Sequence, residues 1–251
     1  MERLRSMHRS WSLVQGWARH QHFGLRQEWL ALYLRCPSDW RQVGGLGNRQ
    51  VQSLEVWLRT VGLHDRPGHE TALCQELRRQ GLASPRPWQR LWTNAVLNWP
   101  TADWYVSECA YGEWTSSELK GRLLASVPRL AERTASNAIM ELVGLLERTP
   151  IGKELKQGEV IRARLRLVRR IGLADPGPEA ILYAAGALFA RERRCRLELQ
   201  EPLPWPWIVF GCRPEEALAT LSAYGSGWFE VRPHSLELLG PMEGLPYAVV
   251  C

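Results

Sequence analysis

The chain has 251 residues, of which 45% are hydrophobic and 23% are charged, a composition that is ordinary for globular proteins. No apolar run approaches the roughly 20 residues that span a bilayer, and Met1 to His20 lack the compact apolar region of a signal peptide. These features argue against a membrane protein or a secreted one. They predict a cytoplasmic protein with no membrane partner.

Positive charge dominates, with a formal net charge of +6, and almost all of it is arginine. The lysines are only Lys120, Lys153 and Lys156. An arginine bias arises in a GC-rich genome, and it also suits a phosphate-binding surface because the planar guanidinium makes bidentate contacts. Whatever the origin of the arginine bias, the net positive charge favours an acidic partner over a basic one.

Cysteine and histidine spacing does not indicate a metal site. The six cysteines include no CxxC pair, and the only close pair of candidate ligands is His20 with His22. Structural zinc sites need two such pairs, and thiols in the cytosol are usually reduced. We therefore expect no metal, no cofactor and no disulfide framework.

The first predicted segment covers residues 1–85 and is helical. Apolar residues at helical spacing predict one helix over residues 26–35 and another from Asn48 to Gly62, joined by a glycine-rich turn at residues 44–47. This order is compatible with a helix-turn-helix unit. The outer face of the second helix carries Arg49, Gln52, Ser53 and Arg59.

The second predicted segment covers residues 86–175. Helices are predicted over residues 88–98, over 102–110, from Thr115 with Glu118 at the capping-box position, and over 135–146. Residues 158–170 then alternate with period two, which predicts a single strand. Arg162, Arg164 and Arg166 share one face of it, and Arg169 and Arg170 follow. Two helices and a basic strand are in the order of a winged helix.

The third predicted segment covers residues 176–251. It contains a helix over residues 179–191, a short strand over 195–199, a helix over 213–224, and a hairpin around Pro233 and His234. A helix is again followed by a two-stranded wing. The expected fold is therefore mainly α with short β-hairpins, of the α+β class, built from tandem winged-helix or helix-turn-helix-like units in three domains.

Catalytic patterns are missing from the sequence. There is no GxSxG turn, and Gly44 to Gly47 lacks the lysine of a phosphate loop and follows no clear strand. Carboxylates such as Glu215 and Glu216 stand at helix starts, where they complement the helix dipole. We expect a protein that is not an enzyme, with no catalytic residues and no small-molecule substrate.

The arginine-bearing faces are the best candidates for a binding surface. Alternate residues of a strand lie about 7 Å apart, so three arginines on one face repel each other unless carboxylates or phosphates pair with them. A solvated face with acidic neighbours, or an ordinary exposed helix face, is the competing interpretation. The predicted nucleic-acid-binding residues are Arg49, Gln52, Ser53, Arg59, Arg162, Arg164, Arg166, Arg169 and Arg170.

Short motifs along most of the chain, from about His20 to Val250, resemble a bacterial family, the domain of unknown function numbered four thousand and seven. The residues that carry the resemblance are His20 to Phe23, Arg26, Trp29, Leu30, Leu46-Gly47, Val51, Trp57, Leu91-Trp92, Thr101-Ala102, Trp104-Tyr105, Pro178-Glu179 and Tyr183-Ala184. Where the family has a Gly-Lys-Asn-Met-Val turn, this chain has Gly47 to Val51, and only Arg49 could replace the lysine. Members resemble accessory components of anti-phage loci, including those of DNA phosphorothioate modification. The resemblance implies a DNA-associated, non-catalytic subunit.

Two functional hypotheses follow, and an enzyme of unfamiliar type, which would gather polar ionisable groups in one pocket, is a third. The first is a DNA-binding accessory subunit of a bacterial defence or DNA-modification system, with protein partners in a multi-subunit complex and RNA as a possible substitute for DNA. The alternative is a protein-docking subunit of a larger, possibly RNA-guided, nucleic-acid-processing complex. In that case tryptophans in turns or proline-rich stretches would be interface anchors. Those tryptophans are Trp40, Trp114, Trp205 and Trp207.

Overall fold

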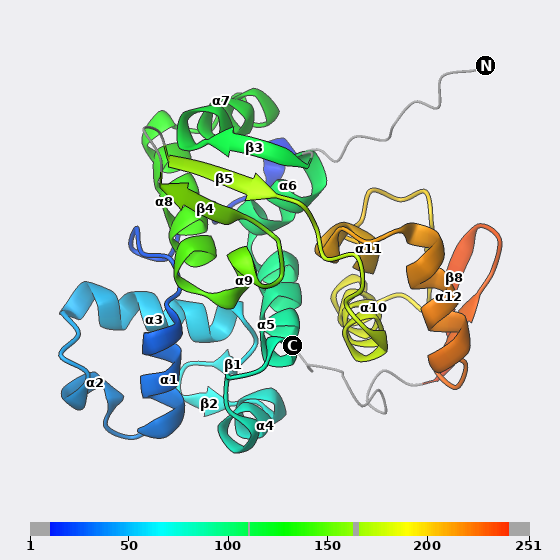
Figure 1. Ribbon diagram of the computed structural model, residues 1–251, viewed down its shortest axis with the longest axis horizontal. Coiled ribbons are helices and arrows are strands. Elements are labelled where there is room, and N and C mark those ends of the chain that lie inside the picture. Colours follow the sequence, from blue (N-terminus) through cyan, green and yellow to red (C-terminus); the bar gives the residue numbers. More distant parts are fainter. Residues whose placement is uncertain (1–10, 110, 163–165, 241–251) are drawn as a thin grey trace.

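The computed structural model describes residues 11–109, 111–162 and 166–240. Within them the protein is mainly helical and contains three small antiparallel sheets, which confirms the expected α+β class (Figure 1). None of the described helices is long and apolar enough to cross a membrane. The cysteines in this part of the chain are free thiols.

The N-terminal part contains the two predicted helices, with the short helix α2 between them, and a hairpin; α2 and the hairpin were not predicted. Its elements are η1 (Trp11–Leu13), α1 (Gln27–Arg35), α2 (Trp40–Val43), α3 (Asn48–Thr60), β1 (His64–Arg66), β2 (His69–Glu70) and α4 (Ala72–Gln80). The apolar stripe of α3 is confirmed, since Leu54, Trp57 and Leu58 are all fully buried. The hairpin β1–β2 escaped prediction because its strands are short and polar, without an apolar alternation.

The central part follows the predicted helix order closely. Its elements are α5 (Pro85–Asn98), α6 (Pro100–Glu108), β3 (Gly112–Thr115), α7 (Ser116–Ser126), α8 (Glu132–Arg148), α9 (Pro150–Lys153), β4 (Glu159–Arg162) and β5 (Arg166–Arg170). The predicted capping box is present. The Thr115 hydroxyl accepts a hydrogen bond from Glu118 N at 3.1 Å, and Glu118 Oε2 accepts one from Thr115 N at 2.7 Å.

The predicted strand over residues 158–170 is wrong in one respect, because the segment forms two strands. β4 and β5 pair antiparallel, with Arg162 opposite Arg166. Residues 163–165, and Arg164 with them, lie outside the described residues. The division into two strands escaped prediction because the sequence between them, Ala-Arg-Leu, has none of the glycine, proline, asparagine or aspartate that usually interrupts a strand pattern.

The C-terminal part also ends in a hairpin, as predicted. Its elements are α10 (Pro178–Glu192), β6 (Arg196–Glu198), α11 (Pro206–Phe210), α12 (Pro214–Tyr224), β7 (Phe229–Val231) and β8 (Ser235–Leu238). The short helix α11 was not predicted, because the prolines before it indicated an interruption. Pro206 fits the first turn of α11, because backbone N–H groups in that turn have no hydrogen-bond partner within the helix.

The two three-stranded sheets have the same strand order. In one the order is β3-β5-β4, and in the other it is β6-β8-β7, so the last strand in sequence lies in the middle of each. In each sheet, helices separate the first strand from the last two strands, which pair with each other. Figure 1 shows the C-terminal part, with its helices and sheet coloured yellow to red, on one side of the molecule.

Helix α5 lies at the centre of a continuous core. It contacts α3, α6, α9, α10 and α11, and its Trp88, Leu91 and Trp92 are fully buried. Asn94 Nδ2 donates hydrogen bonds to Val61 O at 3.0 Å and to the Tyr183 hydroxyl at 2.8 Å. The three predicted segments thus share one core, and their boundaries as domains stay predictions.

A buried histidine–carboxylate pair joins the N-terminal segment to α3 and α8. His20 Nδ1 donates to Glu141 Oε2 at 2.9 Å, and both side chains are almost completely buried. The His20 ring is stacked on Trp57 with 3.6 Å between centroids and meets Trp99 edge-on at 5.0 Å. Glu141 also accepts hydrogen bonds from backbone N–H groups, those of Arg19, His20 and His22. The carboxylate is therefore fully satisfied although it has no contact with water.

The chain crosses α8 so closely at Gly24 that no side chain fits there. A Cβ on Gly24 would lie 2.1 Å from Leu145 N, and one on Gly144 would lie 3.1 Å from Gly24 N. Gly24 is therefore required for the crossing that brings the backbone of residues 19–22 to Glu141, and Gly144 leaves room for the approach. The chain meets α8 here backbone to backbone.

A second buried ion, Arg170, links α6 to α11. Its Nη1 donates to Val106 O at 3.0 Å and Cys109 O at 2.9 Å, and its Nη2 donates to Ile208 O at 3.0 Å. The guanidinium satisfies carbonyls at the end of α6, where a helix leaves them without partners. With only 2% of its surface exposed, Arg170 is structural, and its predicted place on a nucleic-acid-binding surface is wrong.

Replacing this buried guanidinium should destabilise the protein. Arg170→Met leaves several carbonyls without donors, and we expect it to lower the free energy of unfolding by about 3 kcal/mol. Arg169→Met removes the adjacent arginine, whose pair with Glu113 is about half exposed. That control should cost less than about 1 kcal/mol in urea unfolding. Equal losses for the two variants would contradict the structural role of Arg170.

The His20 site predicts a pH dependence of stability. Burial lowers the pKa of His20 below its ordinary value of 6.5, although hydrogen bonding to Glu141 raises it. The unfolded chain therefore binds more protons as the pH falls below 6.5, and the free energy of unfolding should decrease there. Urea unfolding at about pH 7.5 and about pH 5.5 measures the loss. His20→Gln should lose less stability over this interval than the wild type, and an equal loss would count against the assignment.

Candidate nucleic-acid interface

The predicted outer face of α3 presents a stripe of polar side chains to solvent. Arg49, Gln52 and Arg59 are exposed, and at 100° per residue they lie within about 80° of one another around the helix. The nearby carboxylate of Glu55 is already bound by Arg41 at 2.6 Å. Within the described part of the chain, neither Arg49 nor Arg59 forms an ion pair. The guanidinium groups of Arg49 and Arg59 are therefore available to bind an anion.

Ser53, the fourth residue predicted for this face, points inward. Its side chain is fully buried, and its Oγ donates to His20 O at 2.8 Å. Trp57 Nε1 donates to Phe23 O at 2.9 Å from the same side of the helix. The prediction that Ser53 lies on the binding surface is therefore wrong, because it fastens α3 to the N-terminal segment.

Several basic side chains lie near Arg59. The pKa of Arg19 is lowered by burial and then by the charge of Arg59. The pKa of His64 is also lowered by burial; the charges of Glu70 and Asp65 raise it, and those of Arg41 and Arg59 lower it. Basic groups from the N-terminal segment, α2, α3 and β1 thus gather at one end of α3.

A small hollow of about 90 Å³ opens beside this cationic group. It lies between α2, α3 and the turn of the β1–β2 hairpin, and its lining residues are Trp40, Arg41, Glu55, Leu58, Arg59, His64, Pro67 and Gly68. Two arginines and a histidine meet one carboxylate there. Such a hollow has room for a small anionic group and none for a cofactor.

A hydrogen-bond network holds the β1–β2 hairpin next to α3. The Tyr33 hydroxyl donates to Glu70 Oε1 at 2.7 Å and lies 2.6 Å from His64 Nε2, while Arg78 Nη1 donates to Glu70 Oε2 at 2.8 Å. Because the Tyr33 hydroxyl has one proton, His64 Nε2 must donate to its oxygen. Burial raises the pKa of Tyr33, so the phenol stays protonated. No sequence motif predicted this network, because its side chains come from four separate elements, α1, β1, β2 and α4.

The predicted strand face is largely neutralised by carboxylates. Glu147 accepts from Arg162 Nε at 2.8 Å and also pairs with Arg166, and Arg169 pairs with Glu113 at 2.6 Å. Arg162, Arg166 and Arg169 remain at least 41% exposed, so a phosphate could still reach them. These pairs match the competing interpretation of a face with acidic neighbours. Figure 1 places this hairpin and α3 in separate parts of the molecule.

The tryptophans considered as interface anchors are mostly core residues. Trp40, Trp205 and Trp207 are each at most 9% exposed, and Trp205 stacks on Trp207 with 5.0 Å between ring centroids. Trp114 is half-buried beneath the Arg122 guanidinium, which lies 4.0 Å from its ring centroid. The prediction that Trp40, Trp205 and Trp207 anchor an interface is therefore wrong, because their side chains are buried in the core.

Metal-ligating side chains do not gather in the described ranges. Among residues 11–109, 111–162 and 166–240, no group of three or more histidine, cysteine, aspartate or glutamate side chains is placed to hold a metal ion. The expectations of no metal and no cofactor stay predictions.

Comparisons with known proteins find a likeness in fold. No protein-family model matches the chain, and a search of curated proteins gives no match. The magnesium-ion-bound crystal structure of SspB is similar, with a TM-score of 0.64 and 18% sequence identity over 88% of this chain and 82% of that one. At this identity the likeness concerns the fold alone. The arrangement of elements in this chain is therefore one that SspB largely shares.

Proposed function

We propose that this protein is a non-catalytic DNA-binding subunit that reads the duplex with helix α3. The observation that carries the proposal is the exposed face of α3, where Arg49 and Arg59 lack acidic partners among the described residues and Gln52 lies between them. The major groove of DNA admits an α-helix, and arginine and glutamine are side chains that contact base edges and phosphates there.

The surroundings of α3 support this assignment. Helix α2, the glycine-rich turn and α3 have the order of a helix-turn-helix, whose second helix enters the major groove. The β1–β2 hairpin follows α3 and carries the exposed Arg66, so it could reach the backbone beside the groove. The inner side of α3 is fixed by Ser53 and Trp57, which makes the helix a rigid platform.

The central and C-terminal parts are proposed to be winged-helix units. In each, a helix, a strand, two or three helices and a hairpin follow one another, and the last strand lies between the other two, an order that winged helices also have. By analogy α8 and α12 would be the recognition helices. The first turn of α12 holds Glu215 and Glu216, which disfavours phosphate contacts there. We therefore assign DNA contact to α3, with the β4–β5 hairpin as a secondary contact.

The setting in a bacterial defence or DNA-modification system rests on the resemblance described from the sequence. Members of that family resemble accessory components of anti-phage loci. A subunit that holds DNA for a partner enzyme fits that role. Protein partners of the same complex, and RNA in place of DNA, belong to the proposal as alternatives for the test below.

Removing the arginines of α3 should weaken DNA binding. Arg49→Ala and Arg59→Ala each delete one proposed phosphate or base contact, so the slope of log affinity against log salt should fall by about 0.9 for each phosphate that is no longer neutralised. Fluorescence anisotropy with duplex DNA, single-stranded DNA and RNA at several salt concentrations measures both affinity and slope. Arg79→Ala removes an exposed arginine at the end of α4 and should change little. Wild-type binding by both α3 variants would refute the assignment.

Neutralising Glu147 tests the secondary contact. Glu147→Gln frees Arg162 and Arg166 from their shared carboxylate, and we expect duplex binding to tighten by roughly a few-fold at low salt. Glu154→Gln makes the same change in net charge at an exposed glutamate after α9. If the two variants tighten binding equally, the hairpin has no specific role in DNA contact.

A further inference from the structure

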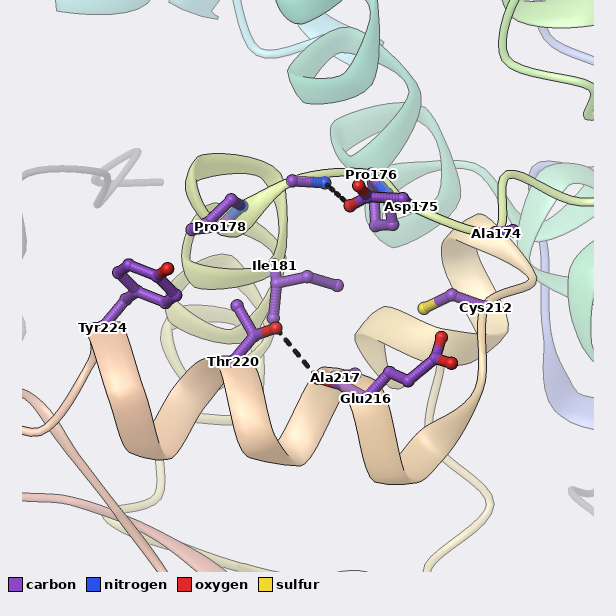
Figure 2. Close-up of a pocket in the computed structure, with 11 residues that line it drawn as sticks. Ala174, Asp175, Pro176, Pro178, Ile181, Cys212, Glu216, Ala217, Thr220 and Tyr224 are labelled. Atoms are coloured by element: carbon purple, nitrogen blue, oxygen red, sulfur yellow. Dashed lines mark hydrogen bonds between the residues drawn. The ribbon is translucent and has the colours of Figure 1, made fainter.

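A trench runs along the C-terminal part, on a surface made by α10, α11 and α12. It consists of two adjoining hollows of about 570 and 640 Å³, which share Ala174, Cys212 and Glu216. Figure 2 shows the first hollow between the loop at residues 174–178 and the outer side of α12. The second continues past the end of α11 to Tyr111. The trench is thus open, and none of its lining residues belongs to α3.

The walls of the trench are mainly apolar. Ile181 and Ala217 line the first hollow, and Trp207 and Ile208 line the second. An exposed tyrosine stands in each hollow, with Tyr224 66% exposed and Tyr111 55% exposed. Large exposed aromatic side chains beside an apolar depression are typical of protein-binding surfaces.

The charge of the trench is opposite to that of the chain as a whole. Asp175 and Glu216 line it as carboxylates, and Arg213, 3.7 Å from Glu216, is the one basic residue among its described lining residues. Burial raises the pKa of the Cys212 thiol to about 11, and the charges of Glu216 and Asp175 raise it as well. Two carboxylates and one guanidinium therefore line the trench, although the protein as a whole carries a net charge of +6.

The trench is preformed in the protein alone. Leu173 N donates to Phe210 O at 2.7 Å, and a Cβ on Gly172, whose φ is +86°, would lie 2.6 Å from Gly211 O. The loop is thereby locked against the end of α11. Asp175 Oδ1 accepts from Gly177 N at 2.9 Å, which holds this carboxylate at the rim (Figure 2). Preformed sites avoid part of the entropic cost of binding.

We propose that this trench binds an extended segment of a partner protein in which apolar side chains flank a lysine or arginine. The apolar side chains would cover Ile181, Trp207 and the two tyrosines, and the basic group would lie against Glu216 and Asp175. Nucleic acid is disfavoured here, because the same carboxylates repel phosphates. The inference is independent of DNA binding by α3, and it gives the subunit a second surface for a protein.

The test is a selection of short random peptides displayed on phage and panned on the wild-type protein. We expect enriched peptides that combine apolar residues with lysine or arginine. Their synthetic copies, measured by fluorescence anisotropy, should bind Glu216→Arg at least about tenfold more weakly than wild type, because the new cation repels the peptide cation.

A matched control lies one residue away. Glu215→Arg makes the same charge reversal in the exposed first turn of α12, yet Glu215 lines neither hollow. It should leave peptide binding nearly unchanged. Circular dichroism and duplex-DNA binding by both variants show whether each is folded, and the trench assignment is decided by peptide binding alone.

Three outcomes would overturn the proposal. One is a selection without enrichment, or with acidic peptides. Another is equal weakening by Glu215→Arg and Glu216→Arg, which would indicate a general charge effect. The third is sedimentation that shows a wild-type dimer and a Glu216→Arg monomer, which would make a second copy of this chain the occupant.

Discussion

One buried carboxylate, Glu141, determines how the N-terminal half of the molecule is assembled. It accepts hydrogen bonds from the backbone N–H groups of Arg19, His20 and His22 and from the His20 ring. A buried charge without partners costs several kcal/mol, so these donors must reach Glu141 for the fold to be stable. The N-terminal segment is therefore held across α8, and the small residues Gly24 and Gly144 permit that crossing.

The same pair fixes the orientation of α3. The His20 ring packs on Trp57, and Ser53 donates to the His20 carbonyl, so one side of α3 is committed to the interior. The other side must then face solvent, and it carries Arg49 and Arg59. A rigid helix holds such side chains more accurately than a loop does. The buried network and the candidate interface are thus two sides of one helix.

Charge is distributed unevenly over the surface. Arginines on the β4–β5 hairpin are matched by Glu147 and Glu113, whereas those on α3 have no acidic partners in the described chain. The trench beside α12 has the opposite sign, with Asp175 and Glu216 among apolar walls. Our two proposals follow from this separation, because a cationic helix and an acidic apolar trench suit different partners. A subunit that holds DNA with one surface and a protein with another is an adaptor.

Local sequence patterns were sufficient for most helices and their ends. The stripe of α3, the Thr115–Glu118 cap of α7, and the helices now seen as α8, α10 and α12 were all predicted, because propensity, periodicity and capping act within a few residues. The exposure of Arg49 and Arg59 followed from the same periodicity. The division into β4 and β5 did not, since the sequence between the two strands has no glycine, proline, asparagine or aspartate.

The sequence by itself determined which segments are helical and which sides of them are apolar. Tertiary structure alone decided that Ser53 is buried against His20, 33 residues away, and that Arg170 binds carbonyls 61 to 65 residues before it. It also decided that Glu147 pairs with Arg162 and Arg166, and that the loop before α10 forms a trench with α12. The physical reason is that burial, ion pairing and surface shape depend on neighbours brought together by folding, and spacing along the chain carries no record of them.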